Sequence, residues 1–199
     1  MKRGVTAAAR VHAPGPGGEP SVAIQSLLQP LFPRAYAAAR CLTGSAAEAE
    51  NLLQETALLA RQEFGTFQAG TNFQVWFLRI LMNSYPLAST ARPSGPVSVD
   101  DAPDPYLRRK TSATRGRHTD PAQACMEKLD TEQVVAALAS LPDEYRVVVT
   151  LYFLEDLSYR DIATIVDWPV ETVRTRLHRG RRLLQVALSA EAHGLSRQN

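Results

Sequence analysis

The chain has 199 residues, of which 45% are hydrophobic and 21% charged, a balance typical of a globular protein with a core. This length corresponds to one or two domains. The formal net charge is only +2, so the overall charge does not by itself indicate a nucleic-acid partner. The positions of the arginines in the sequence are more informative than their number.

Cysteine and histidine usage excludes several classes of protein. Cys41 and Cys125 are the only cysteines, and the four histidines lack the spacing of metal ligands. We therefore expect neither a disulfide framework nor a metal or cofactor site. No apolar run approaches the roughly 20 residues that cross a membrane, and the basic N-terminus lacks a signal peptide's apolar stretch. A cytoplasmic protein without membrane insertion is expected.

The opening of the chain is rich in proline and glycine, so residues 1–20 are expected to form a disordered tail. Residues 21–88 are predicted to form a first helical domain. Its apolar residues recur at helical spacing from Ser21 onward, which predicts a single helix that ends at Gly44.

Two capping boxes predict the starts of the next helices. In Ser45-Ala-Ala-Glu48 and in Thr71-Asn-Phe-Gln74, a hydroxyl stands three residues before a carboxylate or an amide. Each of the two side chains satisfies a backbone amide at the helix start. Pro86 disfavours helical geometry at Tyr85, so the last helix of this domain is expected to end there.

Residues 89–125 contain several prolines and few large apolar side chains, which is typical of a flexible linker. The helical pattern returns in residues 126–190, where Leu141-Pro142 starts one of the helices. Residues 191–199 are expected to be a tail. Because strand-like alternation is lacking, the predicted fold is all-α, with two small helical domains joined by the linker.

The second domain contains a predicted helix-turn-helix. Ser158-Tyr-Arg-Asp161 is a third capping box and opens a short helix, and Asp167-Trp-Pro169 is a turn. A longer helix begins near Val170. A short helix, a tight turn and a longer helix in this order are the helix-turn-helix plan.

The longer helix carries an arginine-rich face opposite its apolar stripe. Such a face is also common on solvated surfaces, but here the helix-turn-helix context favours DNA. Thr172, Thr175 and Arg176 are assigned chiefly to base edges, because threonine and arginine suit the major groove. Arg179, Arg181 and Arg182 are assigned chiefly to phosphates, and Arg174 is a further DNA-binding candidate.

The motifs of both domains resemble one family, the extracytoplasmic function (ECF) sigma factors. Three segments are similar to the family's region 4: Leu141-Pro-Asp-Glu-Tyr-Arg146, residues 157–163 and residues 169–182. Ala49-Glu-Asn-Leu-Leu-Gln-Glu55 and residues 67–83 are similar to its region 2. The resemblance covers residues 27–85 and 126–188, in the family's order.

The resemblance implies a transcription initiation factor without enzymatic activity. Region 4 would bind the minus-35 element and the β flap of RNA polymerase, and an anti-sigma factor would mask these surfaces. Region 2 would dock on the β′ clamp through Glu48, Glu50, Asn51, Gln54 and Glu55. It would also capture a base of the minus-10 element with Phe67, Thr71, Asn72, Trp76 and Asn83. From the residues alone, Trp76 is rather a core residue than a pocket residue.

The sequence departs from the family in two places. Glu48 and Asn51 stand where aspartates are usual, and the segment after Asn83 has Pro86 and one basic residue where many relatives have a basic helix. Two alternatives therefore remain: a sigma-like interaction protein that no longer melts promoters, and a free-standing helix-turn-helix regulator. Arg108, Arg109 and Lys110 form a basic cluster in the linker, which is typical of a solvated segment.

Overall fold

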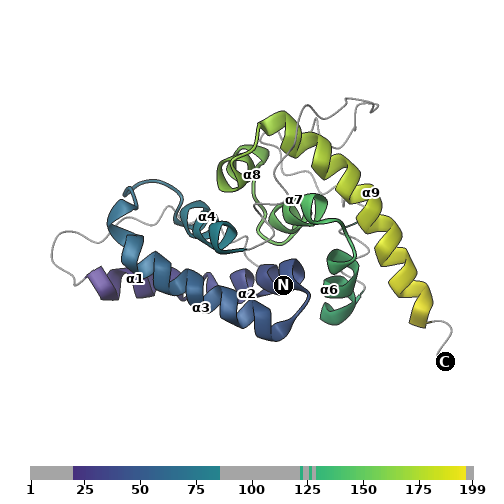
Figure 1. Cartoon of the computed structure of the whole chain (residues 1–199), viewed down its shortest axis with the longest axis horizontal. Coiled ribbons are helices and arrows are strands. Elements are labelled where there is room, and N and C mark those ends of the chain that lie inside the picture. Colours follow the sequence, from purple (N-terminus) through teal and green to yellow (C-terminus); the bar gives the residue numbers. More distant parts are fainter. Residues whose placement is uncertain (1–19, 86–121, 123–125, 127–128, 196–199) are drawn as a thin grey trace, which may run out of the picture.

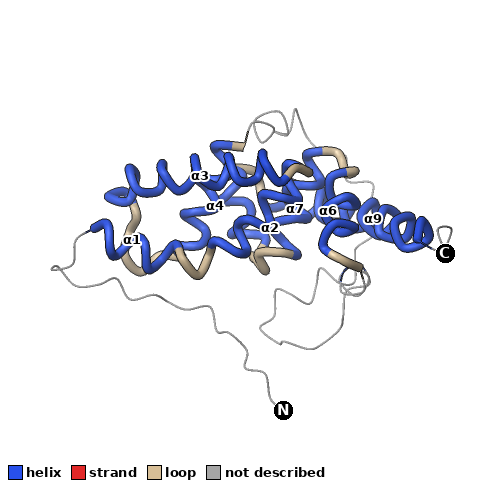
Figure 2. The backbone as a smooth tube through the Cα atoms, turned by 90° about the horizontal axis from the view of Figure 1, so that it is seen from below, coloured by secondary structure: helices blue, strands red, loops and turns tan. Residues whose placement is uncertain are grey.

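The computed structural model describes residues 20–85, 122, 126 and 129–195. Within these residues all regular structure is helical, which confirms the all-α prediction (Figures 1 and 2). Residues 1–19, 86–121, 123–125, 127–128 and 196–199, which include the predicted linker except Ala122, lie outside the described part. The helices are α1 (Pro20–Leu28), α2 (Phe32–Thr43), α3 (Ala46–Glu63), the 3-10 turn η1 (Phe64–Thr66), α4 (Phe73–Ser84), α6 (Thr131–Ala139), α7 (Asp143–Phe153), α8 (Tyr159–Val166) and α9 (Val170–Leu195).

The single helix predicted before Gly44 is wrong, because the structure has two helices there. α1 ends at Leu28, and the Leu31 amide donates to the Leu28 carbonyl at 2.9 Å in a tight turn. Pro30 lies in this turn, where its missing N–H and its ring disfavour a continuous helix. The end of α2 is confirmed: Gly44 adopts a left-handed conformation with φ 73° and its amide donates to Arg40.

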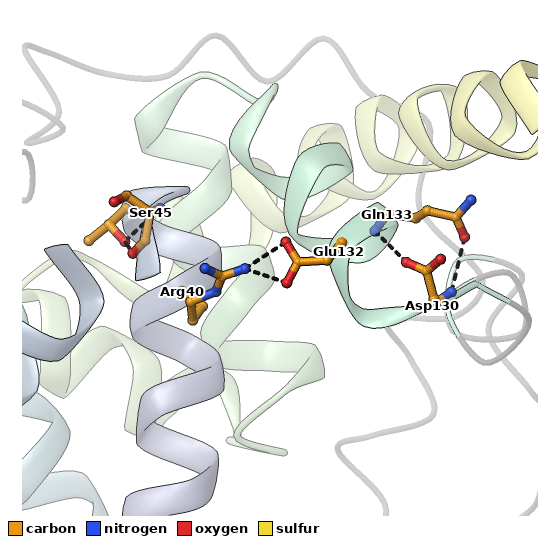
Figure 3. Close-up of polar contacts among 6 residues, drawn as sticks. Arg40, Ser45, Asp130, Glu132 and Gln133 are labelled. Carbon is orange, nitrogen blue, oxygen red and sulfur yellow. Dashed lines mark hydrogen bonds and ion pairs between the residues drawn. The ribbon is translucent and has the colours of Figure 1, made fainter. Parts of the chain in front are cut away.

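The helix starts largely follow the predicted caps. Ser45 accepts the Glu48 amide at the start of α3, and Ser158 and Asp161 form a complete capping box on α8. α4 begins one residue later than predicted, since the Asn72 side chain rather than Thr71 accepts the Gln74 amide at 3.0 Å. Sequence analysis overlooked a capping box between Asp130 and Gln133, which opens α6 (Figure 3).

The buried side of α9 packs on α7 and α6. The predicted apolar stripe is buried along its length, from Val173 and Leu177 to Leu184 and Leu188. Gly180 lies where α7 comes closest: a Cβ added there would lie 2.6 Å from the Val149 side chain. α9 continues to Leu195 and so includes the first five of the residues 191–199 that were predicted as a tail.

The described parts of the two predicted domains pack against each other. We call residues 20–85 (α1–α4) the N-terminal half and residues 129–195 (α6–α9) the C-terminal half. α2 contacts α6 and α7, and α4 contacts α8 (Figure 1). The buried residues of both halves therefore belong to one continuous cluster. None of the described helices is both long and apolar enough to cross a membrane.

Candidate nucleic-acid interface

α8, the turn after it and α9 form the helix-turn-helix that the sequence predicts. Asp167 makes the turn by adopting a left-handed conformation with φ 56° and ψ 47°. The next residue, Trp168, is only 5% exposed and packs inside the motif. α8 has just eight residues, and its capping box and the left-handed Asp167 satisfy backbone groups at both of its ends.

One face of the first half of α9 is accessible and polar. Thr172, Thr175 and Arg179 are partly exposed, and Arg182 is exposed one turn further on. His178 lies on the same face; sequence analysis passed over it, although its spacing of three residues from Thr175 places it there. Arg174 lies beside this face, with its side chain 43% exposed and its guanidinium 3.1 Å from Glu171.

Two of the predicted DNA-binding arginines are not on this face. The Arg176 side chain is 7% exposed, its Nη2 lies 2.9 Å from Glu144 Oε2, and its guanidinium lies 4.4 Å from the centre of the Trp168 ring. Arg181 is also buried. Both positions flank the apolar stripe on the helix, so their side chains leave α9 toward the interior. In this arrangement the Arg176 and Arg181 side chains, which were expected to face DNA, are therefore buried and lie off the accessible face.

Aromatic side chains gather at the start of α4. The Phe67 and Phe73 rings lie 5.2 Å apart edge to face, and Trp76 lies 5.3 Å from Phe73 and 5.6 Å from Phe67. Trp76 is only partly buried, and its indole nitrogen donates to the Thr66 hydroxyl at 3.4 Å. Trp76 therefore packs against the core without being fully buried.

The remaining predicted minus-10 residues divide between the two ends of α4. Thr71 and Asn72 are exposed beside the aromatic cluster. Asn83 is exposed near the other end of the helix, eleven residues after Asn72, which corresponds to roughly 16 Å along the axis. The structure thus brings Phe67, Thr71, Asn72 and Trp76 together and leaves Asn83 apart.

The polar face of α3 is accessible throughout. All five predicted polymerase-binding residues are exposed: Glu48, Glu50, Asn51, Gln54 and Glu55. Three of them, Glu48, Asn51 and Glu55, line a cavity of about 370 Å³.

The same cavity is also lined by Tyr85 and by Arg146 from the C-terminal half, a pairing that sequence analysis did not find. The Tyr85 hydroxyl donates to the Leu42 carbonyl at 2.8 Å. Burial raises the pKa of this phenol, the Arg146 charge opposes that shift, and the Glu48 carboxylate adds to it.

Comparison with known proteins defines the class of this helix-turn-helix. Residues 131–184 match the family model described as Sigma-70, region 4, which covers α6, α7, α8 and the first part of α9. The C-terminal half is therefore a DNA-binding module of the sigma-70 class.

The relatives extend this match to the N-terminal half. The chain is 30% identical over 161 residues to the ECF RNA polymerase sigma factor SigW of Bacillus subtilis, covering 74% of this chain and 79% of that protein. It is 32% identical over 156 residues to EcfG of Rhodopseudomonas palustris, covering 78% and 80%. It is also 33% identical to SigE of Mycolicibacterium smegmatis over 152 residues, which are 76% of this chain and only 56% of that protein. The chain belongs to the ECF RNA polymerase sigma factor family.

Solved structures show the same fold. The sigma factor RpoE of Bartonella quintana, in complex with the anti-sigma factor NepR, has a TM-score of 0.59 at 25% identity, covering 83% of this chain and 96% of that one. CnrH, in complex with the cytosolic domain of CnrY, has a TM-score of 0.58 at 20% identity, covering 85% and 90%. The latter supports the fold alone.

Proposed function

We propose that this chain directs RNA polymerase to specific promoters by binding core polymerase together with the minus-10 and minus-35 elements. The observation that carries the proposal is the accessible face of α9, which presents threonine, histidine and arginine inside a sigma-70 region 4 module. Such a face suits the major groove, where the N-terminal part of the second helix contacts base edges.

The roles along α9 follow from exposure. Thr172 and Thr175 lie on the accessible face in the first two turns and contact bases or the thymine methyl. Arg179 and Arg182 follow one and two turns later and hold phosphates, as Arg174 does at the edge of the face. Arg176 acts indirectly: by joining Glu144 on α7 to Trp168 in the turn, it fixes the angle at which α9 enters the groove.

The N-terminal half supplies the other contacts. The exposed face of α3 carries three carboxylates and two amides, which suits a basic partner surface such as the polymerase clamp. At the start of α4, the partly exposed Trp76 and the exposed Thr71 and Asn72 offer stacking and hydrogen bonds to an unstacked base. The Phe67 ring packs against the Trp76 ring at a centroid distance of 5.6 Å.

Two further parts of the proposal come from the relatives. RpoE of Bartonella quintana is held by an anti-sigma factor, and this supports an anti-sigma partner for the present chain. The relatives named here are initiation factors, which supports a role without catalytic activity of its own and a place of action in the cytoplasm, where transcription takes place.

Run-off transcription with purified bacterial core polymerase on a promoter library tests the proposal. Transcripts that require the chain and are lost in Thr175→Ala and Arg179→Ala are expected, while Arg61→Ala, an exposed arginine at the end of α3, serves as the matched control. Arg176→Ala is unsuitable because its loss disturbs packing. Polymerase binding without transcripts favours the sigma-like interaction protein, and DNA binding without polymerase favours the free-standing regulator.

A further inference from the structure

One large apolar side chain is exposed on the polar side of α3. Leu58 is 60% exposed, and it neither belongs to the buried core nor packs against it. Among the described side chains of the N-terminal half, it is the only large hydrophobic one that is exposed. Single exposed leucines are common on protein surfaces, so its place on the helix decides what it indicates.

Leu58 lies at the centre of the proposed polymerase-binding face. An α-helix turns by about 100° per residue, so side chains three, four or seven positions apart share one side. On this count the five polymerase-binding candidates all lie within roughly 80° of Leu58 around the axis of α3: Glu48, Glu50, Asn51, Gln54 and Glu55. Glu48 and Glu50 bound the face on opposite sides, and Asn51 and Gln54 lie nearest to the leucine.

The surroundings of Leu58 are those of an interface anchor. Gln54 and Glu55 lie one turn before it and Gln62 lies one turn after it, and all three are exposed and polar. Interfaces concentrate their binding energy in a few central side chains, around which polar contacts exclude water. Aromatic residues and arginine fill this role more often than leucine does, but α3 has no aromatic residue. Arg61 is the first cation after Leu58, so the acidic face ends there.

The charged groups of the face are poorly suited to supply most of its affinity. Glu48, Glu50 and Glu55 are exposed, and ion pairs of exposed carboxylates contribute little because water and salt screen them. Asn51, beside the leucine, carries no charge. Removal of Leu58 from water is the contact on this face that salt does not screen.

The fold of the free chain does not depend on this leucine. Because Leu58 lies outside the buried cluster, its truncation leaves no cavity, and alanine is at least as favourable in a helix. A change in binding after substitution therefore reports on the partner contact rather than on folding.

We propose that Leu58 is the apolar anchor of the polymerase-binding face of α3. It enters a shallow apolar depression on core polymerase, and the carboxylates around it face a basic rim there. This inference rests on the proposed function, which names the partner, and it adds the residue that carries most of the affinity of this face. The carboxylates speed and orient the encounter, and Leu58 slows the release.

Equilibrium binding of the full chain to purified core polymerase, at about 0.1 M and about 0.5 M salt, tests the anchor. Leu58→Ala truncates the side chain, Leu58→Met keeps its apolar volume, and Glu55→Gln removes one neighbouring charge. Val186→Ala is the matched control, because it shortens a side chain on α9 that is also apolar and is 71% exposed. Thermal unfolding of each variant shows whether the fold is retained.

We expect Leu58→Ala to weaken binding about tenfold at both salt concentrations, because salt does not screen apolar burial. Leu58→Met and Val186→Ala should bind as the parent does. Glu55→Gln should weaken binding about twofold at low salt and less at high salt.

Three results would contradict these expectations. If Leu58→Ala binds polymerase no more weakly than Val186→Ala does, the anchor is overturned and the proposed function stands. The anchor is also overturned if the free parent is a dimer that Leu58→Ala splits, because a second copy of the chain is then the occupant of this face. A parent chain that does not bind core polymerase overturns the proposed function itself.

Discussion

α3 and α9, the helices proposed to bind polymerase and promoter DNA, differ in where their charged residues lie. On α3 the buried side is made of small and medium residues such as Ala49, Leu52 and Ala60, and every predicted polymerase-binding residue is exposed. α3 packs on α2 and α4, and α9 packs on α7, α6 and α8, but only the buried side of α9 takes in charged residues, Arg176 and Arg181. A charged residue on a helix therefore indicates a binding face only after the buried side of that helix is known.

Of the predicted substitutions, removal of the Arg176 side chain should change the free energy of unfolding most. Arg176→Ala leaves Glu144 without its cation and removes the guanidinium from the Trp168 ring, so we expect a loss of about 3 kcal/mol in the free energy of unfolding. The exposed Arg182→Ala should change it by no more than about 0.5 kcal/mol. Urea denaturation measures both changes in the free energy of unfolding. Equal losses would contradict the difference between the buried Arg176 and the exposed Arg182.

Substituting one glycine in each half allows a direct comparison of how tightly the two halves pack. Gly180→Ala places a Cβ 2.6 Å from the Val149 side chain, whereas a Cβ at Gly65 in the N-terminal half meets nothing within 4 Å. We expect Gly180→Ala to destabilise the protein by about 2 kcal/mol, because overpacking outweighs the better helix propensity. Gly65→Ala should be nearly neutral in the same thermal unfolding experiment. A stable Gly180→Ala protein would show that α9 can move away from α7 at little cost.

Substitution of Arg179 tests the face of α9 that is proposed to contact DNA. Arg179→Ala should weaken binding of the polymerase complex to promoter DNA about fivefold and lower the slope of log affinity against log salt by about 1. Gel-shift titrations at several salt concentrations measure both quantities. If affinity fell while the salt slope stayed the same, Arg179 would be contacting a base rather than a phosphate.

Glu155 should make stability depend on pH. Its burial raises the pKa of the carboxyl above the usual 4.5, against the opposing effects of Gln74 and Arg34. A raised folded-state pKa means that the protonated carboxyl contributes stability below pH 4.5, and that this contribution is lost as pH rises through the folded-state pKa. The parent should therefore lose stability relative to Glu155→Gln between pH 4 and pH 7. Urea denaturation at several pH values measures the free energy of unfolding of both proteins. If the two free energies change in parallel across this range, Glu155 remains solvated.

Local signals made much of this fold predictable. The capping residues Ser45 and Ser158 and the left-handed Gly44 act within a few residues of the chain, and the structure confirms all three. The break at Pro30 and the capping box at Asp130 were also visible in the sequence and were overlooked. Arg176 lies three residues after the buried Val173, so its burial could have been inferred from helical spacing.

The contact between the halves was not predictable in this way. Arg40 and Glu132 are 92 residues apart in the chain, and Gln74 and Glu155 are 81 apart. Neither pair belongs to a periodic pattern, and the exposed side of each helix looks the same whether or not another half covers it. The cavity between α3 and Arg146 forms through the same packing, so it could not be predicted from the sequence either.

The buried thiol on α2 has a consequence for chemical reactivity. Burial raises the pKa of Cys41 to about 12, with the Arg40 charge opposing the shift, so only about one molecule in 10⁵ carries the thiolate at neutral pH. Oxidants and thiol reagents act on the thiolate, and they reach this sulfur only when the helices around it come apart. The rate at which a thiol reagent modifies Cys41 thus reports how often the N-terminal half unfolds, without a substitution in the chain.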